Sequence, residues 1–360
     1  MDLDISDSEE CFEVREAGGG KGLGCFATRD IKPGETVLVS YTSIIDYDSN
    51  SWNVKVDSLI ALYERLHFAD KREWAALSSY YEPGRAEKYK SRLARRRPDG
   101  RLLTEQEQEE FLHLFLAFDN NAFETDAAIR AASVVYPEAS RFNHSCDPNV
   151  DYECNIYPDR WVGRANRQIA VGEELTIGYI TGHRPREERQ ETTRMGWGFD
   201  CMCTKCAGGL DTYTASLEQA RDIANGLDGS MARPTAYGDD IESMAKQLYT
   251  RVNLLREIVP AANPVDRKWR ARELAMALWT ASIFHRNWCD YWMDDSDNGG
   301  NNREEALEHS KLDFQYSAEA VTVARDAWSR NHEMYKCIQR EAKIGKDAWD
   351  NFMAQQGSGA

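Results

Sequence analysis

Apolar residues recur with two different spacings along this chain of 360 residues. Short apolar runs broken by glycine, proline and polar turn residues occupy residues 13–41 and 133–179, which predicts β-strands. Between them, from Ser58 to Phe118, apolar residues return every three or four positions, which is the repeat of an amphipathic helix. Strand patterns stop beyond Leu210, and helical spacing follows. The pattern therefore predicts an α+β protein with a helical insertion and an all-helical C-terminal region.

The changes of spacing also predict where the parts of the chain begin and end. We expect a strand-rich domain over residues 11–208, a helical insertion within it over residues 58–125, and a helical C-terminal domain over residues 209–352. The acidic residues 1–10 and the final residues 355–360 are predicted to be loose. In the C-terminal domain we expect helices over about 217–226, 241–259, 274–288 and 305–328.

Composition and charge narrow the classes of protein to consider. The chain is 42% hydrophobic and 11% aromatic, as in globular proteins. Its formal charge of −16 disfavours direct binding of nucleic acid and suits a basic partner. Neither a run of 18 apolar residues nor a basic, apolar start occurs, so neither membrane insertion nor secretion is predicted. We expect a monomer in the nucleus, the cytoplasm or both.

Two local patterns are interpreted structurally. Eight basic residues lie between Arg85 and Arg101, and we interpret them as a solvated helix face rather than as a localisation signal or docking patch. Residues from Asp294 to Glu305 have the oxygen-ligand spacing of a calcium-binding EF-hand loop. Asn301 occupies a position that such loops give to an apolar residue, so we interpret this segment as a polar connection.

Thiols are concentrated after Asp200. Three cysteines fall within six residues, and packing alone gives no reason for such a cluster. A structural zinc ion gives a reason, because it binds four ligands in a closed tetrahedral site. Cys146 is an available fourth thiol. The sequence therefore predicts one Zn²⁺ site made of Cys146, Cys201, Cys203 and Cys206.

Three further segments carry candidate chemistry, although each alone is typical of an ordinary turn or hairpin. The first is the turn Lys21-Gly22-Leu23-Gly24, whose glycines let the backbone approach a ligand closely. It fits no dinucleotide- or phosphate-binding fingerprint. The second segment runs from Arg141 to Asn149 and contains Asn143-His144-Ser145-Cys146. The third runs from Gly172 to Tyr179.

In this order, together with the cysteine segment, these stretches resemble the signature of SET-domain lysine methyltransferases, and in particular of the SMYD-type branch. The shared motifs are NHSCDPN, GEELTI-x-Y and GF-x-C-x-C-x-x-C, and the resemblance covers roughly residues 11–208. One departure stands out. No cysteine lies between Cys25 and Cys146, so the MYND zinc finger of that branch is absent, and its partner-binding role does not carry over.

The resemblance implies a fold and a set of site residues. It implies small β-sheets with a pseudoknot, in which the NHSC segment threads beneath another, and a zinc-binding post-SET segment. The residues expected to bind the cofactor S-adenosylmethionine are Lys21, Gly22, Leu23, Gly24, Asn143, His144, Tyr179 and Phe199, with Phe199 over the adenine. Tyr179 is the expected catalytic residue, placed at the point of methyl transfer.

The expected function is S-adenosylmethionine-dependent N-methylation of an accessible lysine in a histone or another basic protein. The lysine, with an ordinary pKa of about 10.4, must lose its proton first, and an apolar channel beside a sulfonium favours that loss. Two alternatives stay open: a SET enzyme with a nonhistone or small-molecule acceptor, and a noncatalytic binding scaffold. The intact motifs argue against the scaffold.

Overall fold

The chain divides into two compact units, one formed by Met1–Gly182 with Arg186–Ala207 and one by His183–Pro185 with Gly208–Ala360. The acidic residues 1–10 and most of the calcium-like segment, residues 295–301, lie outside the described residues. The computed structural model describes residues 11–19, 21–42, 44–47, 52–97, 99–124, 132–154, 160–180, 184–207, 215–226, 241–262, 264–294, 302–328 and 332–357.

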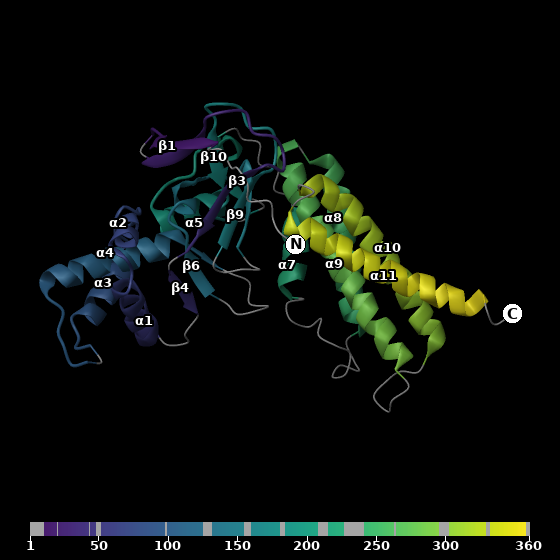
Figure 1. The fold of residues 1–360 in the computed structure, drawn as a ribbon. Helices are drawn as coiled ribbons and strands as arrows, with labels where there is room; N and C mark the ends of the chain where they lie inside the picture. The colour runs from purple at the N-terminus through teal and green to yellow at the C-terminus, as the bar shows by residue number, and fades with distance from the viewer. Residues whose placement is uncertain are drawn as a thin grey trace. The chain divides into compact units, whose positions relative to one another are not determined.

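In the described part of the first unit, the strands form three small sheets (Figure 1). The first sheet, in spatial order, contains β1 (Phe12–Glu16), β2 (Leu23–Ala27), β10 (Glu174–Ile177) and β7 (Asn143–His144). The second contains β3 (Thr36–Tyr41), β9 (Arg160–Ala165) and β8 (Val150–Glu153). The third contains β4 (Ile44–Tyr47), β6 (Ala132–Val135) and β5 (Ala122–Glu124). The first sheet therefore joins three of the segments that carry the sequence motifs.

The first sheet combines a local hairpin with two long-range strand pairings. Strands β1 and β2 form an antiparallel hairpin from Phe12↔Ala27 to Glu16↔Leu23. Strand β10 then pairs antiparallel with β2 and parallel with β7. Leu175 and Ile177 of β10 are buried in a core that also holds Phe142 and Trp161, whose ring centroids lie 5.6 Å apart.

The helical insertion lies between β4 and β5. Its helices are α1 (Trp52–Glu64), α2 (Phe68–Ala75), α3 (Pro83–Leu93) and α4 (Glu105–Asn121). Helix α4 begins with a capping box, in which the Thr104 side chain accepts from the Glu107 N–H and the Glu107 carboxylate accepts from the Thr104 N–H. One face of α4 then packs into the insertion's own core through Phe111, Leu114, Phe115 and Phe118.

The basic run of the insertion is paired with carboxylates of the same insertion. Arg92 of α3 hydrogen-bonds Asp57 of α1, and the Arg97 guanidinium binds both carboxylate oxygens of Glu64 at 2.6 and 3.1 Å. Bidentate pairing of this kind fixes the position of an arginine as well as its charge. These arginines therefore stabilise the packing of the insertion, and with side chains only 11% and 14% exposed they are not part of a solvated helix face, as the sequence had suggested.

Two short helices close the first unit. Helix α5 (Arg186–Trp197) was not expected, since its sequence has few apolar residues, and in it Arg189 and Thr193 are buried. Helix α6 (Thr204–Ala207) starts within the cysteine segment.

The second unit is helical throughout its described residues. It contains α7 (Ala215–Gly226), α8 (Ile241–Ala261), α9 (Pro264–Met293), α10 (Arg303–Ala327) and α11 (Glu333–Gly357). Its core is made of apolar residues from all five helices, among them Leu217, Leu255, Leu278, Ala320 and Ile338. The fold class predicted from the sequence, α+β with a helical C-terminal region, is confirmed.

Two expectations about this unit were wrong in detail. Helix α8 continues one residue past Pro260, because a proline in the final turn removes only a bond near the helix end. The end of the chain was expected to be loose from residue 355, but α11 extends through Gly357.

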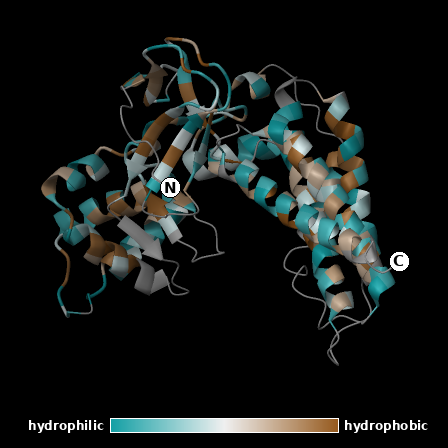
Figure 2. Ribbon diagram, turned by 45° about the vertical axis from the view of Figure 1, so that its right-hand side comes forward, coloured by the Kyte–Doolittle hydropathy of each residue, from teal (hydrophilic) through white to brown (hydrophobic). Residues whose placement is uncertain are grey.

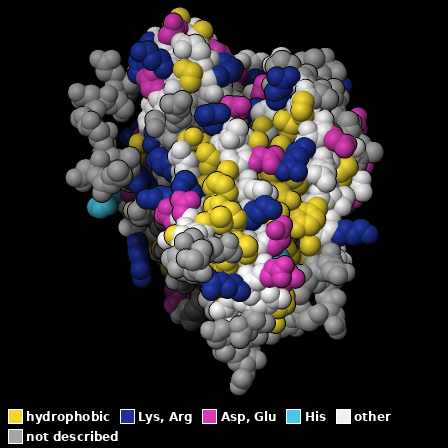
Figure 3. All heavy atoms as spheres, turned by 90° about the vertical axis from the view of Figure 1, so that its right-hand side faces the viewer, with side chains coloured by type: hydrophobic (Ala, Val, Ile, Leu, Met, Phe, Trp, Pro, Cys, Tyr) yellow, Lys and Arg dark blue, Asp and Glu magenta, His cyan; other side chains and the backbone are white. Residues whose placement is uncertain are grey.

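The surface of the second unit mixes residue types. Figure 2 shows hydrophilic and hydrophobic residues interspersed along its helices. On the face turned to the viewer in Figure 3, Lys and Arg side chains lie among Asp, Glu and apolar side chains, so that face carries no field of a single sign. Among the described residues, no helix is both long and apolar enough to cross a membrane.

Candidate active site and metal centre

A parallel pair of strands brings two motifs together. Asn143 and His144 of β7 lie opposite Thr176 and Ile177 of β10. The pairing continues one residue further, because the Ser145 N–H donates to the Ile177 carbonyl at 3.0 Å. The residue after β7 and the residues after β10 therefore leave the sheet side by side, and His144 and Tyr179 meet there.

Asn149 fixes the loop that follows β7 against the edge of β10. Its side-chain amide donates to the Glu173 carboxylate at 3.0 Å and to the Glu174 carbonyl at 2.9 Å. Its side-chain oxygen accepts from the Thr176 N–H at 2.8 Å. Asn149 is 1% exposed, so these bonds are shielded from water. One buried side chain thus replaces a stretch of sheet pairing and holds the loop containing Cys146.

The glycine turn is tied to both strands by Asn143 and Glu174. The Asn143 amide donates to the Leu23 carbonyl at 3.0 Å and to the Glu174 carboxylate at 2.8 Å. The other carboxylate oxygen of Glu174 binds the Lys21 ammonium at 3.0 Å. Three segments that are far apart in sequence are therefore joined through one carboxylate and one amide.

The two glycines of this turn are needed for different reasons. Gly22 has a φ of 72°, in the left-handed region that favours glycine, and a Cβ there would meet open space. Gly24 has an ordinary φ, but a Cβ there would lie 2.8 Å from the Asn143 amide nitrogen and 2.8 Å from a Glu174 oxygen. Gly22 therefore allows the turn, and Gly24 allows the close approach of Asn143 and Glu174.

Tyr179 is held at its backbone, its hydroxyl and its ring. Its N–H donates to His144 Nδ1 at 3.0 Å, and its hydroxyl donates to the Phe142 carbonyl at 2.8 Å. Burial raises the pKa of the Tyr179 hydroxyl above its usual range, so it stays protonated at neutral pH. Since the hydroxyl proton is committed to Phe142, the oxygen presents lone pairs and acts as a hydrogen-bond acceptor.

Aromatic rings surround this tyrosine. The ring centroids of His144 and Trp197 lie 5.3 and 5.2 Å from that of Tyr179, and the centroid of Phe199 lies 6.1 Å from that of His144. Tyr179, Trp197 and Phe199 are all partly exposed. The surroundings of the tyrosine are therefore apolar while remaining open in part to solvent.

The helical insertion supports this aromatic group. The Trp197 indole N–H donates to the backbone carbonyl of Asn120 at 2.8 Å, and the Asn120 amide donates to the Gly196 carbonyl at 2.9 Å. A Cβ at Gly198 would lie 2.3 Å from the ring of Tyr80. The end of α4 and the residue Tyr80 thus fix the chain just before Phe199.

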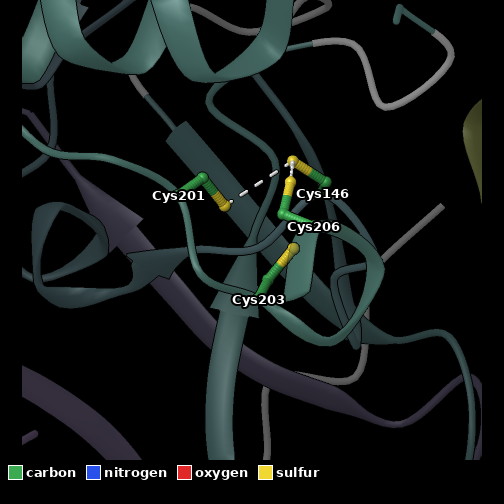
Figure 4. A group of neighbouring side chains, drawn as sticks. All are labelled: Cys146, Cys201, Cys203 and Cys206. Carbon is green, nitrogen blue, oxygen red and sulfur yellow. Dashed lines mark hydrogen bonds between the residues drawn. The ribbon is translucent and has the colours of Figure 1, made fainter. Parts of the chain in front are cut away.

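Four sulfur atoms converge beside this group (Figure 4). Cys146 follows β7, and its Sγ lies 3.7 Å from that of Cys201 and 3.6 Å from that of Cys206. All four sulfurs, with Cys203, lie within 4.8 Å of one another. Zn–S bonds of about 2.3 Å in a tetrahedron place sulfurs roughly 3.8 Å apart. The observed spacing fits one zinc ion, so the cluster could hold it.

The electrostatics of the cluster also suit a cation. The pKa of Cys206 is lowered to about 6, chiefly by its hydrogen bond with Cys146, whereas that of Cys146 is raised, chiefly by its hydrogen bond with Cys201. Four sulfurs this close cannot all be ionised without a compensating charge, and a divalent cation would supply it. The fully buried Arg189 of α5 adds a further positive group, donating to Cys206 Sγ at 3.4 Å.

His144 lies between the sulfur cluster and Tyr179. It is 7% exposed, and burial lowers its pKa to about 4, so its imidazole is neutral at neutral pH. Its Nε2 lies 3.2 Å from Cys146 Sγ, and its Nδ1 accepts from the Tyr179 N–H. The resemblance implies that His144 contacts the cofactor through its backbone, which stays a prediction, and the structure places its side chain between protein groups.

The residues predicted from the sequence are thus brought together at one end of the first sheet. Those around the glycine turn are Lys21, Gly22, Leu23, Gly24 and Asn143, and those around the sulfurs are His144, Tyr179, Phe199 and the four cysteines. Four supporting residues were missed: Glu174, Asn149, Asn120 and Trp197. The two consecutive carboxylates of the GEEL segment were the available signal for Glu174.

Comparison with known families agrees with this picture. Residues 22–180 match the family model described as SET domain. Histone-lysine N-methyltransferase set5 of Schizosaccharomyces pombe is 34% identical over 115 residues, which cover 29% of this chain and 35% of that protein. Histone-lysine N-methyltransferase SMYD3 of Homo sapiens is 43% identical over 72 residues, which cover 20% of this chain and 16% of that protein. The resemblance stated from the sequence is confirmed.

The extent of these similarities is limited. The matched part of the chain spans about a third or less of the length of these curated relatives. Among solved structures, the SET domain of LSMT bound to lysine and AdoHcy aligns over 96% of this chain and 89% of that chain, with 11% identity and a TM-score of 0.38.

Proposed function

We propose, from the SET domain that this chain carries at residues 22–180, that the protein is an S-adenosylmethionine-dependent protein-lysine N-methyltransferase that acts on a histone or another basic protein. The observation that carries the proposal is the hydrogen bonding of the Tyr179 hydroxyl. Its hydroxyl is protonated, donates to the Phe142 carbonyl, and so presents lone pairs among aromatic rings.

The cofactor would be held by the glycine turn and by Asn143. Gly22 and Gly24 leave backbone groups open to a ligand, and the Asn143 amide and Glu174 carboxylate set the distance between the turn and β7. In this arrangement Lys21, Gly22, Leu23 and Gly24 contribute backbone contacts, and Phe199 packs over the adenine. The bound cofactor supplies a methyl group on a sulfonium, which is transferred in line to the acceptor.

Tyr179 would bind the acceptor amine through its oxygen. Because that oxygen can only accept, it favours a partner with an N–H to donate and a positive charge nearby. The rings of Trp197 and His144 replace water around it, and an apolar environment of this kind lowers the pKa of a lysine ammonium. Tyr179 therefore orients the amine and stabilises charge, and it is not required to remove a proton.

The zinc ion would be structural. Cys146, Cys201, Cys203 and Cys206 supply four ligands, which leaves no open position for a substrate. Phe199 packs against this cluster. The metal would thus hold the segment that carries the adenine-covering ring.

A basic protein is the favoured acceptor for two reasons. The chain has a formal charge of −16, which attracts positively charged partners. Its relatives in Schizosaccharomyces pombe and Homo sapiens are named histone-lysine N-methyltransferases. We accordingly place the protein where such substrates occur, in the nucleus, the cytoplasm or both.

Transfer of labelled methyl groups tests the proposal. The protein is incubated with S-adenosylmethionine labelled in its methyl group and with core histones, other basic proteins and small primary amines. We expect label on a protein lysine, located by mass spectrometry, and no label when the acceptor lysines are blocked by prior acetylation. Cofactor binding without transfer to any acceptor would support a noncatalytic scaffold instead, and label on the small amines alone would contradict a protein substrate.

A further inference from the structure

Both ring nitrogens of His144 are hydrogen-bonded to protein groups. Nδ1 receives the Tyr179 N–H at 3.0 Å, and Nε2 lies 3.2 Å from Cys146 Sγ. The ring is buried, with 7% of the residue exposed. Because both ring nitrogens already bind protein groups, the side chain serves to hold other residues in position.

The first of these bonds assigns the proton on the ring. A backbone N–H can only donate, so Nδ1 of His144 must be the unprotonated nitrogen. In the neutral ring the proton then lies on Nε2, which faces Cys146. The Nε2–H group therefore donates to the sulfur, and a thiolate is the better acceptor of such a bond. The backbone donor fixes the direction of the first bond, and the direction of the second follows from the resulting tautomer.

We propose that His144 is a positioning residue that couples the zinc-binding sulfur cluster to the backbone of the catalytic tyrosine. This inference rests on the proposed function, since it assigns the metal a role in placing Tyr179. Cys146 would be held by the metal, and the loop that contains it is fixed by Asn149. Through His144, the same sulfur sets where the backbone of Tyr179 lies.

The coupling has a consequence for the hydroxyl. The Tyr179 hydroxyl is bonded to the carbonyl of Phe142, two residues before His144 in the chain. The tyrosine is thus anchored at both ends to one short segment, residues 142–144, and that segment is bound to the sulfur cluster through the imidazole. A shift of Cys146 would therefore move the backbone anchor of Tyr179.

Two conservative substitutions each remove one of the two hydrogen bonds of His144 and keep the other. In His144→Asn the side-chain oxygen falls near the position of Nδ1, so it can still accept from Tyr179 but cannot reach Cys146. In His144→Gln the amide nitrogen falls near the position of Nε2, so it can still donate to the sulfur but leaves the Tyr179 N–H without its acceptor. Each variant is compared with the wild-type protein after confirming an equal metal content and a cooperative thermal transition.

Two readouts do not depend on activity. The first is the sulfur-to-metal charge-transfer band of protein loaded with Co²⁺, which reports hydrogen bonds to the ligand sulfurs. The second is hydrogen exchange at the Tyr179 amide, which reports the bond to Nδ1. We expect His144→Asn to shift the charge-transfer band and to leave the exchange rate of the Tyr179 amide at its wild-type value. We expect His144→Gln to keep the band and to accelerate that exchange by about 10-fold or more.

The third readout is methyl transfer. If the coupling positions the tyrosine, both variants lower kcat by about 10- to 100-fold, the range for residues that support metal ligands, while the dissociation constant of S-adenosylmethionine changes less than about threefold. Wild-type band and exchange in both variants, or wild-type kcat in both despite altered band and exchange, would overturn the inference. If the wild-type protein transfers no methyl group but band and exchange respond as expected, the proposed function fails whereas the hydrogen-bonded bridge is supported.

Discussion

Gly24→Ala tests how the glycine turn is joined to the strands beneath it. The added Cβ would lie 2.8 Å from the Asn143 amide nitrogen, 2.8 Å from a Glu174 oxygen and 3.2 Å from the Ala17 Cβ. The two 2.8 Å distances are shorter than real contacts allow, so the side-chain ends of Asn143 and Glu174 must move away from residue 24. The bond between them, now 2.8 Å, would then be lost or lengthened.

The expected cost follows from these contacts. Losing a hydrogen bond to a charged group costs about 1.5 to 3 kcal/mol, and crowding a packed site costs about 1 to 3 kcal/mol, of which relaxation recovers part. We expect the free energy of unfolding to fall by about 2 to 4 kcal/mol in chemical denaturation. We also expect the affinity for S-adenosylmethionine to fall by about 10-fold or more in calorimetry, because Asn143 leaves its position.

Two matched variants separate collision from other effects of adding a methyl group. Gly22→Ala adds a Cβ in open space at a φ of 72°, so it costs about 1 to 2 kcal/mol of backbone strain without displacing Asn143. Gly196→Ala adds a Cβ in open space within helix α5 and should leave stability unchanged or raised. If Gly24→Ala resembled Gly196→Ala in stability and in cofactor affinity, the argument from the Asn143 and Glu174 contacts would be refuted.

Three other predictions concern the loop, the metal and the second unit. Asn149→Ala leaves the Thr176 N–H without its partner, so the free energy of unfolding should fall by about 1 to 3 kcal/mol and thermal unfolding should occur at a lower temperature. An unchanged transition would contradict the role of Asn149. We expect elemental analysis to find one zinc ion in the wild-type protein and much less in Cys203→Ser, and equal zinc in both would contradict the site. Burial lowers the pKa of His285 to about 3 from about 6.5, so between these values the unfolded chain binds a proton that the folded chain does not. Stability of the second unit should therefore be full above about pH 6.5 and fall by about 2 kcal/mol by pH 5, and His285→Asn should show less of this fall; an equal pH dependence in both would refute the assignment.

Local signals in the sequence were sufficient to predict most of the helices and strands. The hairpin of β1 and β2 was predictable because its turn residues are glycines, and α4 because its apolar residues repeat at helical spacing. Helix α5 was not predictable in the same way. Its sequence, REERQETTRMGW, is polar, and the residues it buries are an arginine and a threonine, Arg189 and Thr193. Such a helix is stabilised by tertiary contacts that no spacing rule represents.

The residues of the site also fall into two groups, those that a local motif identifies and those that only the fold brings together. The cysteines and Tyr179 were predicted because a short motif identifies them. Glu174 was missed because its partner Lys21 is 153 residues away, and Asn120 because its partner Trp197 is 77 residues away. The paired carboxylates of its segment marked Glu174 as a candidate, but no local pattern identifies the distant partner on which its role depends. These residues become visible when the fold brings the two segments together.

The most direct test of the account is methyl transfer by Tyr179→Phe. This substitution keeps the ring between His144 and Trp197 and deletes the hydroxyl, with its bond to the Phe142 carbonyl and its lone pairs. We predict a fall of about 10²- to 10³-fold in the single-turnover rate, with zinc content retained and the dissociation constant of S-adenosylmethionine changed much less. Methyl transfer at the wild-type rate would contradict the central claim, because Tyr179 would then be a packing residue and the reaction would take place elsewhere.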